Sequence, residues 1–162
     1  MAVRVTSHQL NSLVAAQLDR RLRYRCLVLQ TGDLAVLTQL CEAGTQALQQ
    51  LGGSVQVLEY RDQLDEVGAL ACNRVLEKIE HLAQSNPLLI AGPLHFLDYW
   101  SPQVGAAFWE YLASYSTGPG ILIADTPREC GVEGAFRLVR TVQGTDIRVL
   151  KSRLATAQDG LV

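Results

Sequence analysis

The sequence has few lysines, no long apolar run and no paired cysteines. Its two lysines are Lys78 and Lys151, and the formal net charge is −2 with a pI near 5.9. A charge balance so close to neutral disfavours a chain-wide attraction to nucleic acid. No apolar run reaches the length of a membrane-spanning helix, and the first residues have no signal-peptide pattern. We therefore expect a cytoplasmic protein that does not contact a membrane.

The four cysteines are scattered, without a C-x-x-C pair or the Cys/His spacing of a zinc site. We expect reduced thiols, no metal site and no cofactor. Cys130 is kept as a candidate nucleophile, because it follows a predicted strand end.

Both of the glycine-rich nucleotide-binding loops are missing. A phosphate loop requires G-x-x-x-x-G-K-[ST], whose backbone N–H groups and lysine bind the phosphates. The segment from Leu29 to Leu34 has one glycine and no lysine, and Asp33 would place a negative charge where the phosphates bind. No G-x-G-x-x-G follows a predicted strand, which disfavours the usual dinucleotide-binding fold.

The centre of the chain consists of two short apolar runs with an amphipathic stretch between them. Leu88 to Ala91 and Ile121 to Ala124 are each bounded by turn-forming residues, which is typical of strands buried on both faces. Residues 101–116 place apolar side chains at helical spacing. Such a strand–helix–strand unit predicts a parallel sheet covered by helices.

Further elements extend this unit over one predicted domain, residues 1–162. In chain order we expect helices over about 7–22, 34–51, 62–84 and 101–116, and strands over 23–30, 55–60, 88–91 and 121–124. Alternating segments over 135–142 and 146–154 predict a closing hairpin, followed by a polar tail from 155. The predicted fold class is α/β, with three α/β/α layers, a mainly parallel sheet and a C-terminal β-hairpin.

Ligands of such sheets bind beyond the carboxyl ends of the strands, so residues there are the first candidates. Asp125 either caps the turn that follows it or faces a ligand or partner. His95 is either a structural residue or a base near the same edge. With Cys130 as a nucleophile and Arg128 for an anionic substrate, these residues predict, as one alternative, a small enzyme.

The strand over 88–91 is followed by Gly92, without the acidic residue that a magnesium-bound water would need. Asp98 lies six residues later, and we interpret it as a loop or helix-cap residue rather than a magnesium ligand.

Two tryptophans and a run of arginines are candidate contact residues. Trp100 and Trp109 extend beyond one helix face, so each either packs on a neighbouring helix or contacts a partner. The arginine cluster after the first helix is either a solvated, helix-ending group or a patch for an acidic partner or a phosphate backbone. With Arg137 and Arg140, it would favour nucleic-acid binding as a third class. The cluster consists of Arg20, Arg21, Arg23 and Arg25.

In layout, the chain resembles the RecA-like branch of the P-loop NTPases, which includes RecA, KaiC and SulA-type proteins. The resemblance runs from the first strand to the closing hairpin, and Leu88 to Ala91 stands where the magnesium-binding strand would be. It implies a RecA-like fold. In KaiC-like members, a lysine-x-arginine at the end of the hairpin reaches the neighbouring subunit's nucleotide site, and Lys151 and Arg153 match that pattern.

The resemblance also implies what this chain does not do. Because the phosphate loop and the acidic residue of the third strand are missing, it implies a degenerate pseudo-ATPase that hydrolyses no nucleotide in its own site. Similar small proteins, such as the cell-division inhibitor SulA and the Elongator subunits, are binding or regulatory subunits, and others accompany phage-defence systems. We therefore expect a non-catalytic, protein-binding or regulatory subunit: a cell-division inhibitor, or an accessory to an active ATPase or a homo-oligomer in DNA metabolism or defence. Nucleic acid would be contacted only within a complex.

Overall fold

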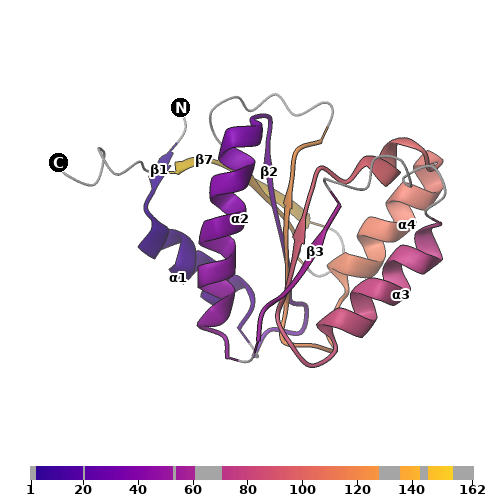
Figure 1. The fold of residues 1–162 in the computed structure, drawn as a ribbon, viewed down its shortest axis with the longest axis horizontal. Helices are drawn as coiled ribbons and strands as arrows, with labels where there is room; N and C mark the ends of the chain where they lie inside the picture. The colour runs from indigo at the N-terminus through magenta and orange to yellow at the C-terminus, as the bar shows by residue number, and fades with distance from the viewer. Residues whose placement is uncertain are drawn as a thin grey trace.

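The computed structural model describes residues 3–19, 21–52, 54–60, 71–127, 136–142 and 146–154 (Figure 1). Its elements, in chain order, are β1 (Val3–Val5), α1 (Ser7–Gln17), β2 (Cys26–Thr31), α2 (Leu34–Gln49), β3 (Gln56–Glu59), α3 (Cys72–Ala83), β4 (Leu88–Ala91), η2 (His95–Asp98), α4 (Pro102–Ala113), β5 (Ile121–Asp125), β6 (Phe136–Val142) and β7 (Asp146–Leu154).

The strands form one sheet in the order β1-β7-β6-β2-β5-β4-β3. Strands β2, β5, β4 and β3 are mutually parallel, whereas β6 pairs antiparallel with both β2 and β7. In the parallel half, the last strand along the chain, β5, lies between the first and the third. This order differs from those of the dinucleotide-binding and flavodoxin-like sheets, in agreement with the missing glycine fingerprint.

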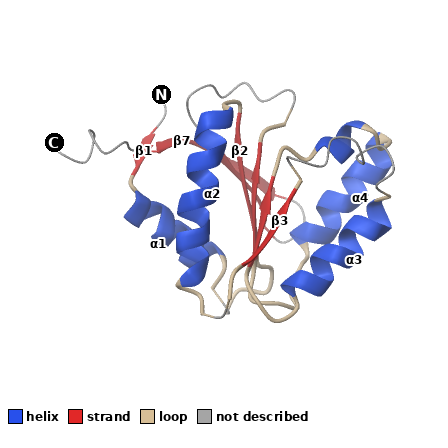
Figure 2. Ribbon diagram, viewed as in Figure 1, coloured by secondary structure: helices blue, strands red, loops and turns tan. Residues whose placement is uncertain are grey.

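Helices cover both faces of the sheet, with α1 and α2 on one side and α3 and α4 on the other (Figures 1 and 2). Successive side chains of a strand point to opposite faces of the sheet, so one strand can pack against the helices on both sides. Leu27 and Leu29 of β2 pack in the α1/α2 cluster, whereas Cys26 and Val28 pack in the α3/α4 cluster. The predicted α/β fold, with a parallel sheet between helical layers, is therefore confirmed.

The two apolar runs at the centre of the sequence form the central strands β4 and β5. Every residue of both strands is buried, because the sheet has helices on both faces at this point. Strand β4 has the predicted bounds, and β5 extends one residue further, to Asp125. The polar residue at that strand end is therefore part of the sheet itself.

Side chains that cap the helices fix several helix starts. Thr6 and Gln9 form a reciprocal capping box at α1, with the Gln9 N–H donating to Thr6 Oγ1 at 3.1 Å. The prediction of a helix to residue 22 was wrong: α1 ends at Gln17. Beyond it, the Arg21 N–H donates to Asp19 Oδ1 at 2.8 Å, which forms a local turn in place of another helical turn.

Several predictions fall wholly or partly outside the described residues. These include the first part of the helix over 62–84, the tail from 155, and Arg20, Arg128 and Cys130. The turn over 143–145 also lies outside them, so the C-terminal hairpin stays a prediction, although β6 and β7 pair antiparallel. Strand β1 was not predicted. Within the described part of the chain, no helix has the length and apolar character needed to cross a membrane.

Candidate functional site

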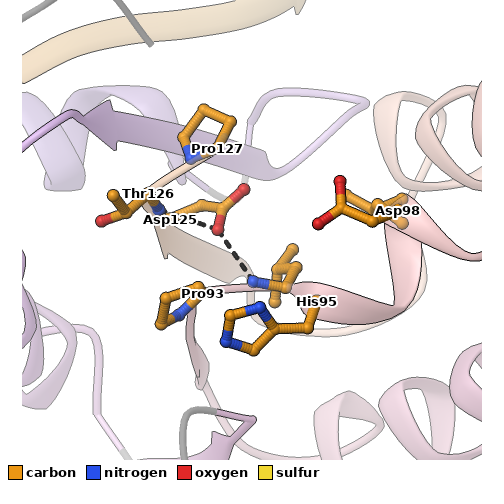
Figure 3. Close-up of a pocket in the computed structure, with 8 residues that line it drawn as sticks. Pro93, His95, Asp98, Asp125, Thr126 and Pro127 are labelled. Carbon is orange, nitrogen blue, oxygen red and sulfur yellow. Dashed lines mark hydrogen bonds between the residues drawn. The ribbon is translucent and has the colours of Figure 1, made fainter. Parts of the chain in front are cut away.

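A pocket of about 300 Å³ opens at the carboxyl ends of β4 and β5 (Figure 3). This is the edge where ligands of parallel α/β sheets bind. Two segments line it, one following β4 and the other at the end of β5. The first contributes Pro93, Leu94, His95, Leu97 and Asp98, and the second contributes Asp125, Thr126 and Pro127.

Asp125 ties these two segments together. The residue is 1% exposed, and its Oδ1 accepts hydrogen bonds from the Leu94 N–H at 3.0 Å and the Thr126 N–H at 2.8 Å. The turn-capping role expected for this residue is therefore present. The same carboxylate also lines the pocket, so the structural and ligand-facing interpretations do not exclude each other.

Gly92 provides the space that the Asp125 carboxylate occupies. A Cβ at Gly92 would lie 2.5 Å from Asp125 Oδ1 and 3.1 Å from the Leu94 nitrogen. The Gly92 N–H donates to the Ala124 carbonyl at 2.8 Å, which holds this backbone close to β5. The Asp125 carboxylate of the neighbouring strand therefore lies directly beside Gly92.

Burial raises the pKa of the Asp125 carboxyl above its ordinary value of 3.8. The backbone hydrogen bonds from Leu94 and Thr126 and the proximity of His95 oppose this rise, whereas the negative charge of Asp98 adds to it. Ionised Asp125 is therefore disfavoured by its surroundings in the folded protein.

This raised pKa predicts a pH-dependent effect of the Asp125→Asn variant. The variant keeps an oxygen for both backbone hydrogen bonds and removes the charge. Because the folded protein holds the Asp125 proton more tightly than the unfolded chain does, ionisation costs folding stability. This cost is absent at pH values well below 3.8, the ordinary pKa, and it is complete at pH values above the folded-state pKa. We expect the variant to be more stable than wild type at about pH 7, with the difference vanishing near pH 3.

Thermal unfolding of both proteins across a pH series, followed by circular dichroism, measures this difference. A difference that is constant with pH, or that grows toward acid, would contradict the prediction.

An aromatic cluster packs around Phe96 of η2, the short helix that lines the pocket. Phe96 of η2 is fully buried, and its ring centroid lies 4.9 Å from that of Tyr60, 4.6 Å from that of Trp100 and 5.6 Å from that of Phe108. Packing of Phe96 fixes the short helix that carries the pocket residues on either side of it.

The tryptophans belong to this cluster, and an exposed tyrosine adjoins it. Trp100 and Trp109 are half-buried and pack against Phe108, at 5.4 and 5.2 Å between ring centroids. Their predicted contact with a partner stays a prediction. Tyr99, which was not singled out from the sequence, is 68% exposed directly after η2.

A side-chain cap closes the N-terminus of α2 to a bound phosphate. Gly32 and Asp33 alone connect β2 to α2. Asp33 Oδ1 accepts from the Ala35 N–H at 2.8 Å, and Thr31 Oγ1 accepts from the Asp33 N–H at 3.2 Å. The predicted cap is confirmed, and its carboxylate stands where a bound phosphate would have to approach.

The Arg25 side chain binds backbone carbonyl groups and does not only face solvent. Its guanidinium donates to the carbonyls of Leu22 at 2.9 Å, Ser116 at 2.8 Å and Gly118 at 2.7 Å. These bonds fix the segment that precedes β2 against the loop between α4 and β5.

The other arginines of the basic cluster lie nearer the surface. Arg21 forms an ion pair with Asp19 at 2.9 Å, and the Arg23 guanidinium lies 5.3 Å from the centroid of the Tyr24 ring. Arg20 lies outside the described residues. A role of the cluster toward an acidic or phosphate partner stays a prediction.

The structure brings together part of the enzyme alternative. His95 and Asp125 line the same pocket, whereas Cys130 lies outside the described residues. Lys151 and Arg153 lie in β7, opposite Arg137 of β6 and Arg4 of β1 respectively. Their predicted action on a partner stays a prediction.

Asp98 is the pocket residue that the sequence reasoning assigned differently. It ends η2 and lines the pocket together with Asp125, Thr126 and Pro127. Across the described ranges, no group of three or more His, Cys, Asp and Glu side chains is placed to hold a metal ion. Comparisons of the chain with protein-family models, with curated proteins and with solved structures find no match.

Proposed function

We propose that this chain is a non-catalytic cytoplasmic protein of the RecA-like class that acts by binding another protein. It serves as a regulatory or accessory subunit, such as a cell-division inhibitor or a component that joins an active ATPase in DNA metabolism or defence. The observation that carries the non-catalytic part of this proposal is the closed N-terminus of α2.

Free N–H groups at a helix N-terminus are a ready site for phosphate. At α2 the Ala35 N–H is already bound, and its acceptor is the negatively charged Asp33. A phosphate would have to displace this carboxylate and overcome its charge. With no lysine in the two-residue connection and no acidic side chain at Gly92, the groups that hold a nucleotide and its magnesium are missing.

Exposed apolar side chains support the binding part of the proposal. Tyr99 is 68% exposed, Leu34 is 59% exposed and Val104 is 38% exposed. Tyr99 directly follows η2, Leu34 is the first residue of α2, and Val104 lies in the first turn of α4. Tyrosine is enriched in protein interfaces, because it buries apolar area and keeps a polar group.

The proposal gives Lys151 and Arg153 a role in a partner's nucleotide site, following their match to the lysine-x-arginine pattern. A cation supplied by a neighbouring subunit stabilises the charge that develops on a transferred phosphoryl group. This chain would then supply a basic group to an active site without having one of its own.

We predict that the purified chain neither binds nor hydrolyses MgATP. Calorimetric titration and a phosphate-release assay measure this directly.

The tagged chain should capture a protein partner from its host, to be identified by mass spectrometry. If that partner is an ATPase, the Lys151→Ala/Arg153→Ala double variant should lower the turnover of the complex by at least about tenfold, whereas Lys78→Ala on α3 should leave it unchanged. ATP hydrolysis by the purified chain that is lost in Asp125 variants would overturn the proposal.

A further inference from the structure

The pocket between β4, η2 and β5 has carboxylates on opposite sides. Asp125 belongs to the sheet, and Asp98 ends η2 (Figure 3). Both hydrogen bonds that described groups donate to Asp125 reach Oδ1. Figure 3 shows its second oxygen pointing away from these donors, with the Asp98 carboxylate turned toward it across the pocket. A carboxylate has about four acceptor positions on its two oxygens, so Asp125 has acceptor capacity left for a ligand.

A second polar group of the pocket also lacks a protein partner. Thr126 lines the pocket, and its Oγ1 is buried without a hydrogen-bond partner in the described part of the chain. Buried polar atoms without partners are rare in folded proteins and often indicate a missing water or ligand. Figure 3 shows this hydroxyl on the side of Thr126 that faces away from Asp98, so it marks an unfilled polar position next to the two carboxylates rather than between them.

The charge and shape of the pocket limit what it can hold. Against the two carboxylates stands one imidazole, His95, as the other titratable group of the lining. A buried carboxylate is stabilised by a cation with which it can form a hydrogen bond. The remaining walls are apolar: Pro93, Leu94, Leu97 and Pro127.

Apolar walls that lead to charged acceptors match a long basic side chain. Lysine and arginine bury their aliphatic stems against apolar surface while the head group reaches a charge. At about 300 Å³, the volume is at the lower limit of ordinary ligand pockets, which suits one side chain rather than a nucleotide.

We propose that this pocket receives a lysine or arginine side chain of a protein partner, with Asp125 and Asp98 binding its cationic head group. The choice of a protein as the source of this side chain rests on the proposed function. The chemistry of the pocket does not, because it follows from the residues that line it.

The first experiment tests the pocket chemistry without a partner. N-acetyl-arginine amide is titrated into the ¹⁵N-labelled chain, and N-acetyl-citrulline amide, its neutral counterpart of similar shape, serves as the comparison. We expect shifts of the amide signals of Leu94, His95 and Thr126 with the arginine compound, and at least about tenfold weaker binding of citrulline. Asp125→Asn and Asp98→Asn should each weaken arginine binding by about tenfold.

The controls separate loss of charge from loss of fold. Asp125→Asn retains an acceptor for the Leu94 and Thr126 N–H groups, and Asp98 is exposed. Glu110→Gln removes the same charge from α4 at an exposed position outside the pocket, and it should bind arginine as wild type does. Equal binding of arginine and citrulline, or arginine binding unchanged in both aspartate variants, would overturn the proposal.

The second experiment tests the source of the side chain. The partner captured by the wild-type chain is offered to the Asp98→Asn/Asp125→Asn double variant and to Glu110→Gln. Loss of capture by the double variant alone supports a basic side chain of the partner. Capture unchanged in the double variant, with arginine amide still bound by wild type, overturns the protein source and assigns the pocket to a free organic cation. If no partner is captured at all, the proposed function fails, and the arginine titration still decides the pocket chemistry.

Discussion

The Phe96→Ala variant is expected to lose about 4 kcal/mol of unfolding free energy, the largest effect of any single substitution considered for this protein. Phe96 is fully buried, and its ring lies within 5.6 Å, between centroids, of three other aromatic rings. Truncation removes the apolar contact and leaves a cavity among rigid neighbours that cannot easily fill it. For a chain of this length, the melting temperature should fall by roughly 10 °C.

Chemical denaturation of Phe96→Ala and wild type measures this loss. Tyr99→Ala is the matched control, because it removes an aromatic side chain three residues away that is 68% exposed. Its effect should stay within about 0.5 kcal/mol. A loss below about 1 kcal/mol for Phe96→Ala would show that the aromatic cluster is not packed as described. Because Phe96 packs η2 in place, the variant should also weaken the binding of any ligand to the pocket.

Gly118→Ala is expected to destabilise the protein by about 3 kcal/mol, through overpacking and a lost hydrogen bond. A Cβ at Gly118 would overlap the Ala83 carbonyl oxygen and the Tyr115 hydroxyl. These two groups are joined by a buried hydrogen bond of 3.0 Å that the hydroxyl donates. The Gly118 carbonyl is also held by the Arg25 guanidinium at 2.7 Å. The loop therefore has little room to move away from an added methyl group.

Gly105→Ala provides a control of the opposite sign. Gly105 lies within α4, and nothing lies within 4 Å of the position a Cβ would take. Alanine is the better helix former by about 1 kcal/mol, so this variant should be more stable than wild type. Thermal and denaturant unfolding of the two variants side by side provides the test. If both substitutions shift stability in the same direction, the packing described around Gly118 is incorrect.

The sequence predicted best the elements whose signal is local. The strands β4 and β5 are short apolar runs between turn formers, and the structure places them within one residue of their predicted ends. Asp33 was predicted as a cap from its position before an apolar periodic stretch, and it binds the Ala35 N–H. Capping and burial on both faces depend on a few neighbouring residues, so they can be read without knowledge of the rest of the fold.

Elements that depend on distant parts of the chain were missed. β1 has three residues, too few to show a periodic pattern, and it exists by pairing with β7. The end of α1 was placed too far along, because the Asp19–Arg21 turn competes with the helix through side-chain bonds that spacing does not reveal. Such competition is decided by geometry rather than by apolar periodicity.

The candidate site was predicted in part for the same reason. Asp125 and His95 were placed at the carboxyl edge from the strand ends, and both line the pocket. Asp98 was assigned to a loop or helix cap, because the sequence pattern gives no signal for the 3-10 turn that it ends. The contact between Asp125 and the segment after Gly92 depends on two strands far apart in sequence, and only the sheet order places them side by side.

The pairing of β1 with β7 also has a consequence for the order in which the protein assembles. Val3 lies opposite Ser152 in parallel register, so two strands that are far apart in the described chain pair with each other. The strands of the parallel half are complete once residue 125 has been made, and they can pair with one another while the remainder is being translated. Contacts between distant positions form slowly, because a long loop must close first. We therefore expect the parallel half of the sheet to form before β1 joins β7.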